Sequence, residues 1–312
     1  MFDDDAPHMY ETDSSGDSAA LDGITAAVVG GDGREVEYLR GLKESGAEVR
    51  ACGLPPEAAE VLGHPQAEDP ETAISGADAV FTTVVHITEE GELHTPGWEG
   101  TVYQDAFSHV DPGSVLYIGT STPEIDGYAE ETGFDVVEYG DDDELMHLRA
   151  PTIIEGVLGI TIEHTDVSIH DSHSVVLGFG RMGFSMTRTL EALGAHTTVV
   201  ARDGAQLSRA RELGARPVHL DNLPAAVGNA DMIFNTIPVT VLSRDVLEGV
   251  PREAFILDLA STPGGTDFDA AEDLGIDAVL APGLGGRAPK TAGRYQWMGL
   301  RRMLLDRLDR DD

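Results

Sequence analysis

The sequence predicts an α/β protein with two doubly wound parallel-sheet domains, of which the second is a Rossmann dinucleotide-binding domain, joined by a connecting helix. Three observations lead to this prediction. Strand-like and helix-like patterns alternate along the chain from Ile24 onward. A glycine-rich turn of the dinucleotide-binding type lies between a strand and a helix in the second half. The length of 312 residues allows two domains that each bury a core.

Residues 23–150 are expected to form the first domain, a flavodoxin-like or Rossmann-like domain that holds the substrate. Its strand-like segments are short and apolar, as is typical of a parallel sheet, and an amphipathic segment over 34–45 predicts a helix. The turn Gly30–Arg34 is rich in glycine but places Val36 where the third glycine of a dinucleotide fingerprint would stand. We therefore expect no nucleotide site in this domain. Its predicted strands lie within 24–31, 47–52, 77–85, 113–119 and 134–140.

Residues 151–170 predict the connecting helix, because Pro151 suits a first helical turn and apolar residues follow it at helical spacing. Residues 171–290 are expected to form the NADP-binding Rossmann domain, and 291–312 a C-terminal helix with an acidic tail. The six strands expected in the Rossmann domain lie near 173–177, 196–201, 215–218, 231–236, 255–259 and 277–280.

The turn at 178–183 carries the most specific local signal in the chain. Gly178 permits the tight turn after the strand, Gly180 lets a pyrophosphate approach the backbone, and Gly183 lets the helix pack on the strand. Arg181 and Met182 stand between the last two glycines, at the helix N-terminus where phosphate binds. Because a strand, a helix and a second strand all fall where the motif requires them, the turn predicts a dinucleotide site.

The end of the next strand bears on which dinucleotide binds. NAD enzymes usually carry an acidic residue here for the ribose 2′-hydroxyl, whereas this strand ends at Ala201 and Arg202, and a guanidinium suits a 2′-phosphate. This favours NADP as the cofactor. Asp203 follows directly, so a small shift of the loop would present a carboxylate and favour NAD instead.

The net charge of −36 and the pI near 4.3 exclude a general nucleic-acid-binding surface, which would be basic. Only Lys43 and Lys290 are lysines among 20 basic residues. One interpretation is a halophile-like protein that works in concentrated salt, where repulsion among carboxylates is screened. An ordinary acidic protein is the other.

Cys52 is the single cysteine, so the chain has no disulfide of its own and no cysteine-based zinc site, and we expect a reducing cytoplasm and no metal. Residues 1–22 lack the basic start and apolar core of a signal peptide, so we do not expect them to be one. Their acidic composition predicts a disordered tail instead. No apolar run reaches the roughly 18 residues of a membrane span, so no membrane association is expected.

Five segments closely resemble the A subunit of dipicolinate synthase, and VVGGDGREVEYLR in the first domain resembles it more loosely. The phrase DLAS-x-PGGTDF together with APKTAG is specific to that family, whereas the glycine motif alone is not. The five segments are PTIIEGVLGITIEHTDVSIH, GFGRMG, NTIP at 235–238, ILDLASTPGGTDF at 256–268 and APGLGGRAPKTAG at 281–293.

This resemblance implies an NADP-dependent oxidoreductase that forms dipicolinate, a pyridine dicarboxylate, from a partly reduced heterocycle of the lysine pathway. It also implies a role in sporulation and a flavoprotein-like second subunit; we further expect a homo-oligomer. The sequence departs from the family at Thr262, where arginine is usual, at 82–87 and at 118–121. These positions lie on loops that could contact the substrate, so the resemblance supports the family's cofactor for this chain better than it supports the family's substrate.

Four residues are candidates for substrate binding and catalysis. Arg34, with the amides of its turn, would bind substrate carboxylates if it faces the carboxyl ends of the strands, although an arginine opening a helix is often a solvated surface residue. Lys290 would bind a carboxylate or relay a proton, or form a structural ion pair. His86 is a candidate base, as are His164 and His170. Glu155 either faces the substrate site or is only a first-turn carboxylate that the helix dipole stabilises.

Two further strand ends complete the expected cofactor site, one on its adenosine side and one beside the nicotinamide. A loop Pro263-Gly264-Gly265 follows the second and can approach a ligand closely. The candidates are Asn235, Thr236, Ile237 and Pro238, then Asp258, Ala260 and Ser261, and finally Pro282 and Gly283 after the last strand.

Two other functions share this architecture. A 2-hydroxy-acid dehydrogenase would want an arginine after the fifth strand and a histidine after the sixth, where this chain has Thr262 and Pro282–Gly285. The second is a non-catalytic NADP-binding sensor or scaffold, which the sequence alone does not separate from an enzyme.

Overall fold

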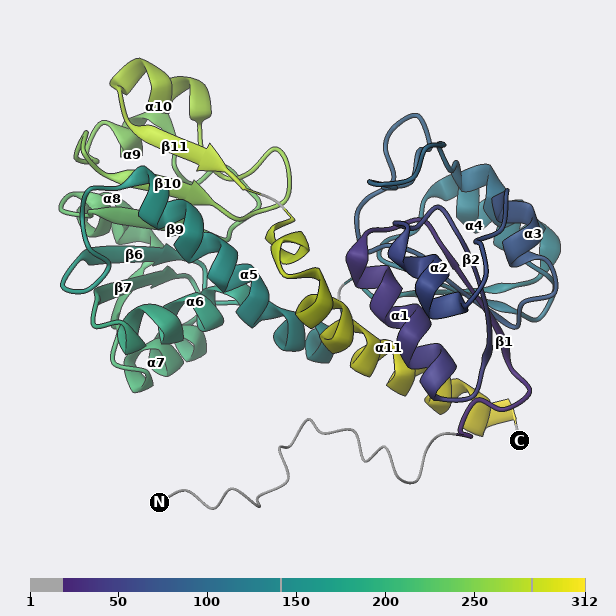
Figure 1. Cartoon of the computed structure of the whole chain (residues 1–312). Coiled ribbons are helices and arrows are strands. Elements are labelled where there is room, and N and C mark those ends of the chain that lie inside the picture. Colours follow the sequence, from purple (N-terminus) through teal and green to yellow (C-terminus); the bar gives the residue numbers. More distant parts are fainter. Residues whose placement is uncertain (1–18, 141, 282, 312) are drawn as a thin grey trace. The chain divides into compact units, whose positions relative to one another are not determined.

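The computed structural model describes residues 19–140, 142–281 and 283–311 (Figure 1). Most of the predicted acidic tail, residues 1–18, lies outside these ranges. The chain forms two compact units, Met1–Leu145 with Pro289–Asp312 (unit 1) and Met146–Ala288 (unit 2). Each unit is built on its own parallel sheet with helices packed against it. The predicted fold class of two doubly wound α/β domains is confirmed.

Unit 1 holds a five-stranded parallel sheet in the order β2-β1-β3-β4-β5, the flavodoxin-like order. Its central strands are almost wholly buried, which explains their unbroken apolar sequence. The strands are β1 (Thr25–Val29), β2 (Glu48–Cys52), β3 (Ala79–Phe81), β4 (Val115–Ile118) and β5 (Asp135–Glu138).

The helices of unit 1 include the C-terminal one, which returns to this unit rather than extending the Rossmann domain. That helix, α11, begins at Pro289 instead of 291. It packs along α1, and Gly41 makes this possible, because a Cβ there would lie 2.0 Å from the indole nitrogen of Trp297. The helices are α1 (Gly33–Glu44), α2 (Glu57–Leu62), α3 (Pro70–Ile74), α4 (Pro123–Thr132) and α11 (Pro289–Asp311), with a 3₁₀ turn at Gln104–His109.

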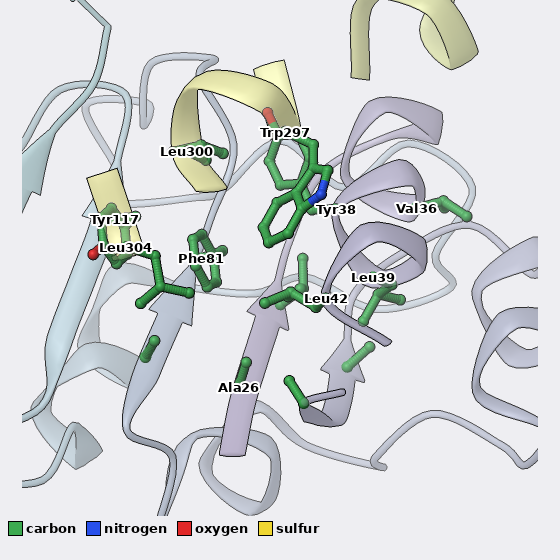
Figure 2. Close-up of a cluster of buried hydrophobic side chains, with 14 of the residues drawn as sticks. Ala26, Val36, Tyr38, Leu39, Leu42, Phe81, Tyr117, Trp297, Leu300 and Leu304 are labelled. Carbon is green, nitrogen blue, oxygen red and sulfur yellow. The ribbon is translucent and has the colours of Figure 1, made fainter. Parts of the chain in front are cut away.

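An aromatic cluster fills the space between α1, α11 and the sheet of unit 1 (Figure 2). Phe81 stacks on Tyr117 with ring centroids 4.7 Å apart, and Trp297 meets Phe81 edge-on at 6.2 Å. The Tyr38 hydroxyl, buried in the same cluster, donates a 2.8 Å hydrogen bond to Oε1 of Gln296. The C-terminal helix is therefore part of the core of this unit.

Unit 2 holds a six-stranded parallel sheet in the order β11-β10-β9-β6-β7-β8, the order of a complete Rossmann domain. The strands are β6 (His173–Leu177), β7 (His196–Ala201), β8 (Arg216–His219), β9 (Met232–Asn235), β10 (Phe255–Asp258) and β11 (Asp277–Leu280). The helices are α6 (Arg181–Ala192), α7 (Gly204–Glu212), α8 (Leu223–Val227), α9 (Arg244–Leu247) and α10 (Phe268–Leu274), with 3₁₀ turns at Leu220–Asn222 and Leu284–Arg287.

The connecting helix α5 (Asp143–His164) begins eight residues before the predicted start, so Pro151 lies inside it. The predicted start was wrong because Asp142 supplies an earlier cap: its Oδ1 accepts a hydrogen bond from the Leu145 amide at 2.9 Å. Asp143 and Glu144, in the first turn, then stabilise the helix through their interaction with its dipole.

By length and composition α5 would pass for a membrane span, with a mean hydropathy of 1.2 over its most apolar window. Its apolar residues have another explanation, because Ile154, Val157 and Ile160 are buried in the core of unit 2. Packing of one helical face therefore accounts for the apolar sequence.

Candidate functional site

The glycine-rich turn of unit 2 joins β6 to α6 with the geometry of a pyrophosphate site. A Cβ on Gly178 would lie 2.5 Å from the Thr236 hydroxyl oxygen, and one on Gly183 would lie 2.2 Å from the Gly178 carbonyl oxygen. Gly180 caps α6 without a side-chain hydrogen bond, and a Cβ there would meet nothing within 4 Å. The turn is thus tight where helix meets strand and open where a phosphate would bind, so these residues fit a dinucleotide.

The end of β7 separates the two residues that bear on cofactor choice. Arg202 follows buried Ala201 and is exposed. Asp203 is the N-cap of α7, and its Oδ1 accepts a 2.8 Å hydrogen bond from the Gln206 amide. Both side chains are exposed, and one carboxylate oxygen of Asp203 is held by its own helix, so Arg202 presents a cation at this strand end.

The ends of β9 and β10 are joined by a buried polar network. Asn235 and Asp258 are in register and fully buried, and Asn235 Nδ2 donates to Asp258 Oδ2 at 3.0 Å. Thr236 donates its hydroxyl to the Leu177 carbonyl at 2.8 Å, which ties β9 to the glycine turn. Among the other predicted cofactor residues, Ala260 is buried, Ile237 is partly buried and Pro238, Ser261 and Gly283 are exposed, while Pro282 lies outside the described residues.

In unit 1, the turn between β1 and α1 buries a charged cluster. Arg34 is only 5% exposed, so it is not a solvated surface residue. Its Nε and Nη2 each donate a 2.9 Å hydrogen bond to the two oxygens of Asp32, the N-cap of α1. The guanidinium is therefore already engaged by a neighbouring carboxylate at the edge where substrate carboxylates were predicted to bind.

Glu35 completes a capping box with Asp32. Its Oε2 accepts a 2.8 Å hydrogen bond from the Asp32 amide, and its Oε1 is buried with no hydrogen-bond partner among the described residues. Burial raises the pKa of this fully buried carboxyl to about 7, against the opposing attraction of Arg34. Gly31 leaves the room that this side chain needs, since a Cβ there would lie 2.5 Å from it.

His94 is the titratable residue that sequence reasoning missed. Its Nε2 lies 3.6 Å from Asp32 Oδ2, and its carbonyl accepts a 2.8 Å hydrogen bond from the Gly31 amide. Burial acts to raise the pKa of Asp32, but the approach of His94 and the hydrogen bonds from Arg34 outweigh it and hold that pKa well below its usual range. No sequence spacing links His94 to Asp32; only the loop that brings residue 94 back to the end of β1 does.

The other predicted catalytic residues are exposed. His86 lies in the loop after β3, and Glu155 lies on the solvent face of α5 in unit 2. Lys290 is in the first turn of α11, which packs beside the start of α1: a Cβ on Gly33 would lie 3.1 Å from Pro289. The structure therefore brings Arg34 and the Lys290 turn together in unit 1 and places Glu155 in the other unit.

Two known families match the chain, one in unit 1 and the other in unit 2. Residues 25–140 match the N-terminal domain of the dipicolinate synthase A subunit, and residues 161–260 match the NAD binding domain of D-isomer specific 2-hydroxyacid dehydrogenases. The dipicolinate synthase A subunit of Bacillus subtilis is 36% identical over 289 residues, which cover 92% of this chain and 97% of that protein.

Solved structures agree with these sequence matches. The dipicolinate synthase A subunit from Bacillus halodurans has a TM-score of 0.85 and 32% identity, covering 91% of this chain and 98% of its own. The corresponding B. subtilis structure has a TM-score of 0.83 and 36% identity, covering 92% and 98%. A transhydrogenase from Sinorhizobium meliloti, at 14% identity, 90% and 94% coverage and a TM-score of 0.67, shares the fold.

Proposed function

The chain belongs to the family of dipicolinate synthase A subunits, and from this premise we propose that it oxidises dihydrodipicolinate, or a close cyclic precursor, to dipicolinate with reduction of NADP. It is an oxidoreductase with a Rossmann domain for a nicotinamide dinucleotide. The observation that carries the proposal is the glycine turn of unit 2, whose packing fits a dinucleotide, in a chain with this family's first domain.

The proposed chemistry is balanced by the cofactor alone. The ring carbon of the dihydro substrate loses a hydrogen with its electron pair to the nicotinamide, a proton leaves the ring, and the product becomes aromatic. The chain then has to hold the dinucleotide, place the dicarboxylate and accept the proton. No second oxidant is needed.

The preference for NADP rests on Arg202. A guanidinium at this strand end gives charge-assisted hydrogen bonds to a 2′-phosphate, and one carboxylate oxygen of Asp203 is already held by an amide of α7. We expect Arg202→Ala to weaken NADP binding by about tenfold or more and to leave NAD binding nearly unchanged. Arg209→Ala on α7, which removes another exposed arginine of the same unit, is the control. Equal affinity of the parent protein for NADP and NAD, measured by titration, would contradict the assignment.

His94 is the proposed proton acceptor. If its Nε2–H points at Asp32, the other ring nitrogen is left as an acceptor, and the ionised carboxylate stabilises the imidazolium that forms. Asp32 is the charged group of this turn that lies next to His94, and Arg34 and Glu35 are bound to Asp32 in turn. We expect His94→Gln to lower kcat by about a hundredfold.

The control for His94 is His109→Gln, because His109 makes a comparable pair with Glu71 at 3.7 Å but ends the 3₁₀ turn Gln104–His109 instead of lying beside Asp32. A kcat of His94→Gln close to that of the parent would exclude His94 as the proton acceptor. Turnover itself is followed by the simultaneous growth of NADPH and pyridine absorbance. If NADP protects the protein from heat but no dihydro-dicarboxylate of this class is oxidised, the chain is a non-catalytic NADP sensor and the proposal fails.

A further inference from the structure

Asp258 is a buried carboxylate that binds four donors of the chain itself. Its Oδ2 accepts from the Gly265 amide at 2.8 Å, the Thr266 hydroxyl at 2.6 Å and Asn235 Nδ2 at 3.0 Å. Its Oδ1 accepts from the Ala260 amide at 3.0 Å. These contacts tie both ends of the loop 260–266 to the last residue of β10, and the side chain is fully buried, so its hydrogen bonds serve the protein's own loops.

Asn235 fastens the neighbouring loop in the same way. Its Nδ2 donates to the Ile237 carbonyl at 3.0 Å, and its Oδ1 accepts from the Ile237 amide at 3.1 Å. The side chain therefore holds the turn that follows β9, and its bond to Asp258 joins that turn to the loop after β10.

The two loops are also packed directly against each other. The amides of Val241 and Leu242 both donate to the Gly265 carbonyl at 3.0 Å. A Cβ on Gly265 would lie 2.2 Å from the Ile237 carbonyl oxygen and 2.7 Å from that of Val239, so only glycine allows this approach. Val239, 61% exposed, and Ser261 are outer residues of the joined loops.

We propose that Asn235 and Asp258 are positioning residues, which hold the loops 237–242 and 260–266 as one rigid wall against the nicotinamide half of the cofactor without touching it. In a Rossmann domain the adenosine half lies over the strand after the glycine turn, here β7, and the nicotinamide half lies over the strands on the other side, here β9 and β10. The inference rests on the proposed function for its cofactor, and it assigns these two residues to the orientation of the nicotinamide instead of direct binding.

Asp258→Asn tests this role, because an amide NH₂ replaces one acceptor and faces donors of the chain. We expect kcat to fall by about tenfold or more, while the affinity for 2′,5′-ADP, which carries only the adenosine half, stays within about twofold. The fluorescence anisotropy of bound NADPH should also fall, since the nicotinamide ring is held less firmly. That readout requires no substrate, so it remains informative if the proposed oxidation is not observed.

Two further variants separate positioning from general damage. Thr266→Val removes one of the four donors and should give a smaller change of the same kind, which covers the case that Asp258→Asn does not fold. Asp267→Asn alters only the N-cap of α10, whose Oδ1 accepts from the Ala270 amide at 3.0 Å, and should behave like the parent. The proposal is overturned if affinity for 2′,5′-ADP falls in parallel with kcat, or if kcat and NADPH anisotropy both stay at the parent values.

Discussion

Glu35→Gln tests the electrostatics of the buried turn in unit 1. The substitution keeps the acceptor for the Asp32 amide and removes the ionisable proton. Because burial raises the pKa of Glu35 from 4.5 to about 7, the folded state disfavours its charged form. At 1.36 kcal/mol per factor of ten, ionisation of this carboxyl above pH 7 costs unit 1 about 3 kcal/mol.

The direction of the pH dependence follows from that rise. The cost is absent below pH 4.5, where the carboxyl is protonated in both the folded and the unfolded chain, and it is complete above about pH 7. The parent protein should therefore lose stability as pH rises through this window, and Glu35→Gln should lose less. The buried NH₂ of Gln adds its own cost, but that cost does not change with pH.

The assay is urea unfolding followed by tryptophan fluorescence at constant high salt. Trp98 and Trp297 are the two tryptophans of the chain and both lie in unit 1, so the signal reports this unit alone. The difference in free energy of unfolding between variant and parent should change by about 2.5 kcal/mol between about pH 5 and about pH 8. Glu130→Gln on α4 controls for the loss of one charge. A difference that is the same at both pH values would refute the reasoning.

Two other predictions concern the cofactor turn and the surface charge. Gly183→Ala should lower NADPH affinity by about tenfold or more, because its Cβ would meet the Gly178 carbonyl oxygen at 2.2 Å. Gly204→Ala at the start of α7, where a Cβ meets nothing within 4 Å, should leave the affinity unchanged. Fluorescence titrations that give the two variants equal NADPH affinity would argue against the packing described. The midpoint of thermal unfolding should rise steeply from low to molar salt, because salt screens the repulsion among charges that sum to −36. A midpoint that does not depend on salt would contradict the halophile-like interpretation.

The sheets could be predicted from the sequence because local patterns determine them. Short strand-like segments indicated the strands, with ends that shifted by a few residues, and the glycine turn lies between β6 and α6 as predicted. The return of α11 to unit 1 could not be predicted. It depends on Gly41 meeting Trp297, a contact between residues far apart in the sequence.

The site shows the same division between local and distant contacts. The assignment of Asn235 and Asp258 to the cofactor site, made from their place at strand ends, remains a prediction, and the donors that bind Asp258 come from a loop whose path the sequence does not reveal. The burial of Arg34 and the approach of His94 to Asp32 likewise depend on tertiary packing. The choice of His86 as a base remains a prediction, because position after a strand was its only support.

The central claim is that this chain transfers a hydride from a dihydro-dicarboxylate ring to NADP. The most direct test uses dihydrodipicolinate with deuterium on the saturated ring carbon that bears a carboxylate, the proposed hydride donor. It is incubated with the protein and NADP, and the nicotinamide is analysed by mass spectrometry and NMR. We predict that deuterium appears at C4 of NADPH in step with the formation of dipicolinate. Dipicolinate that forms without label in NADPH, or no dipicolinate at all, would contradict the account.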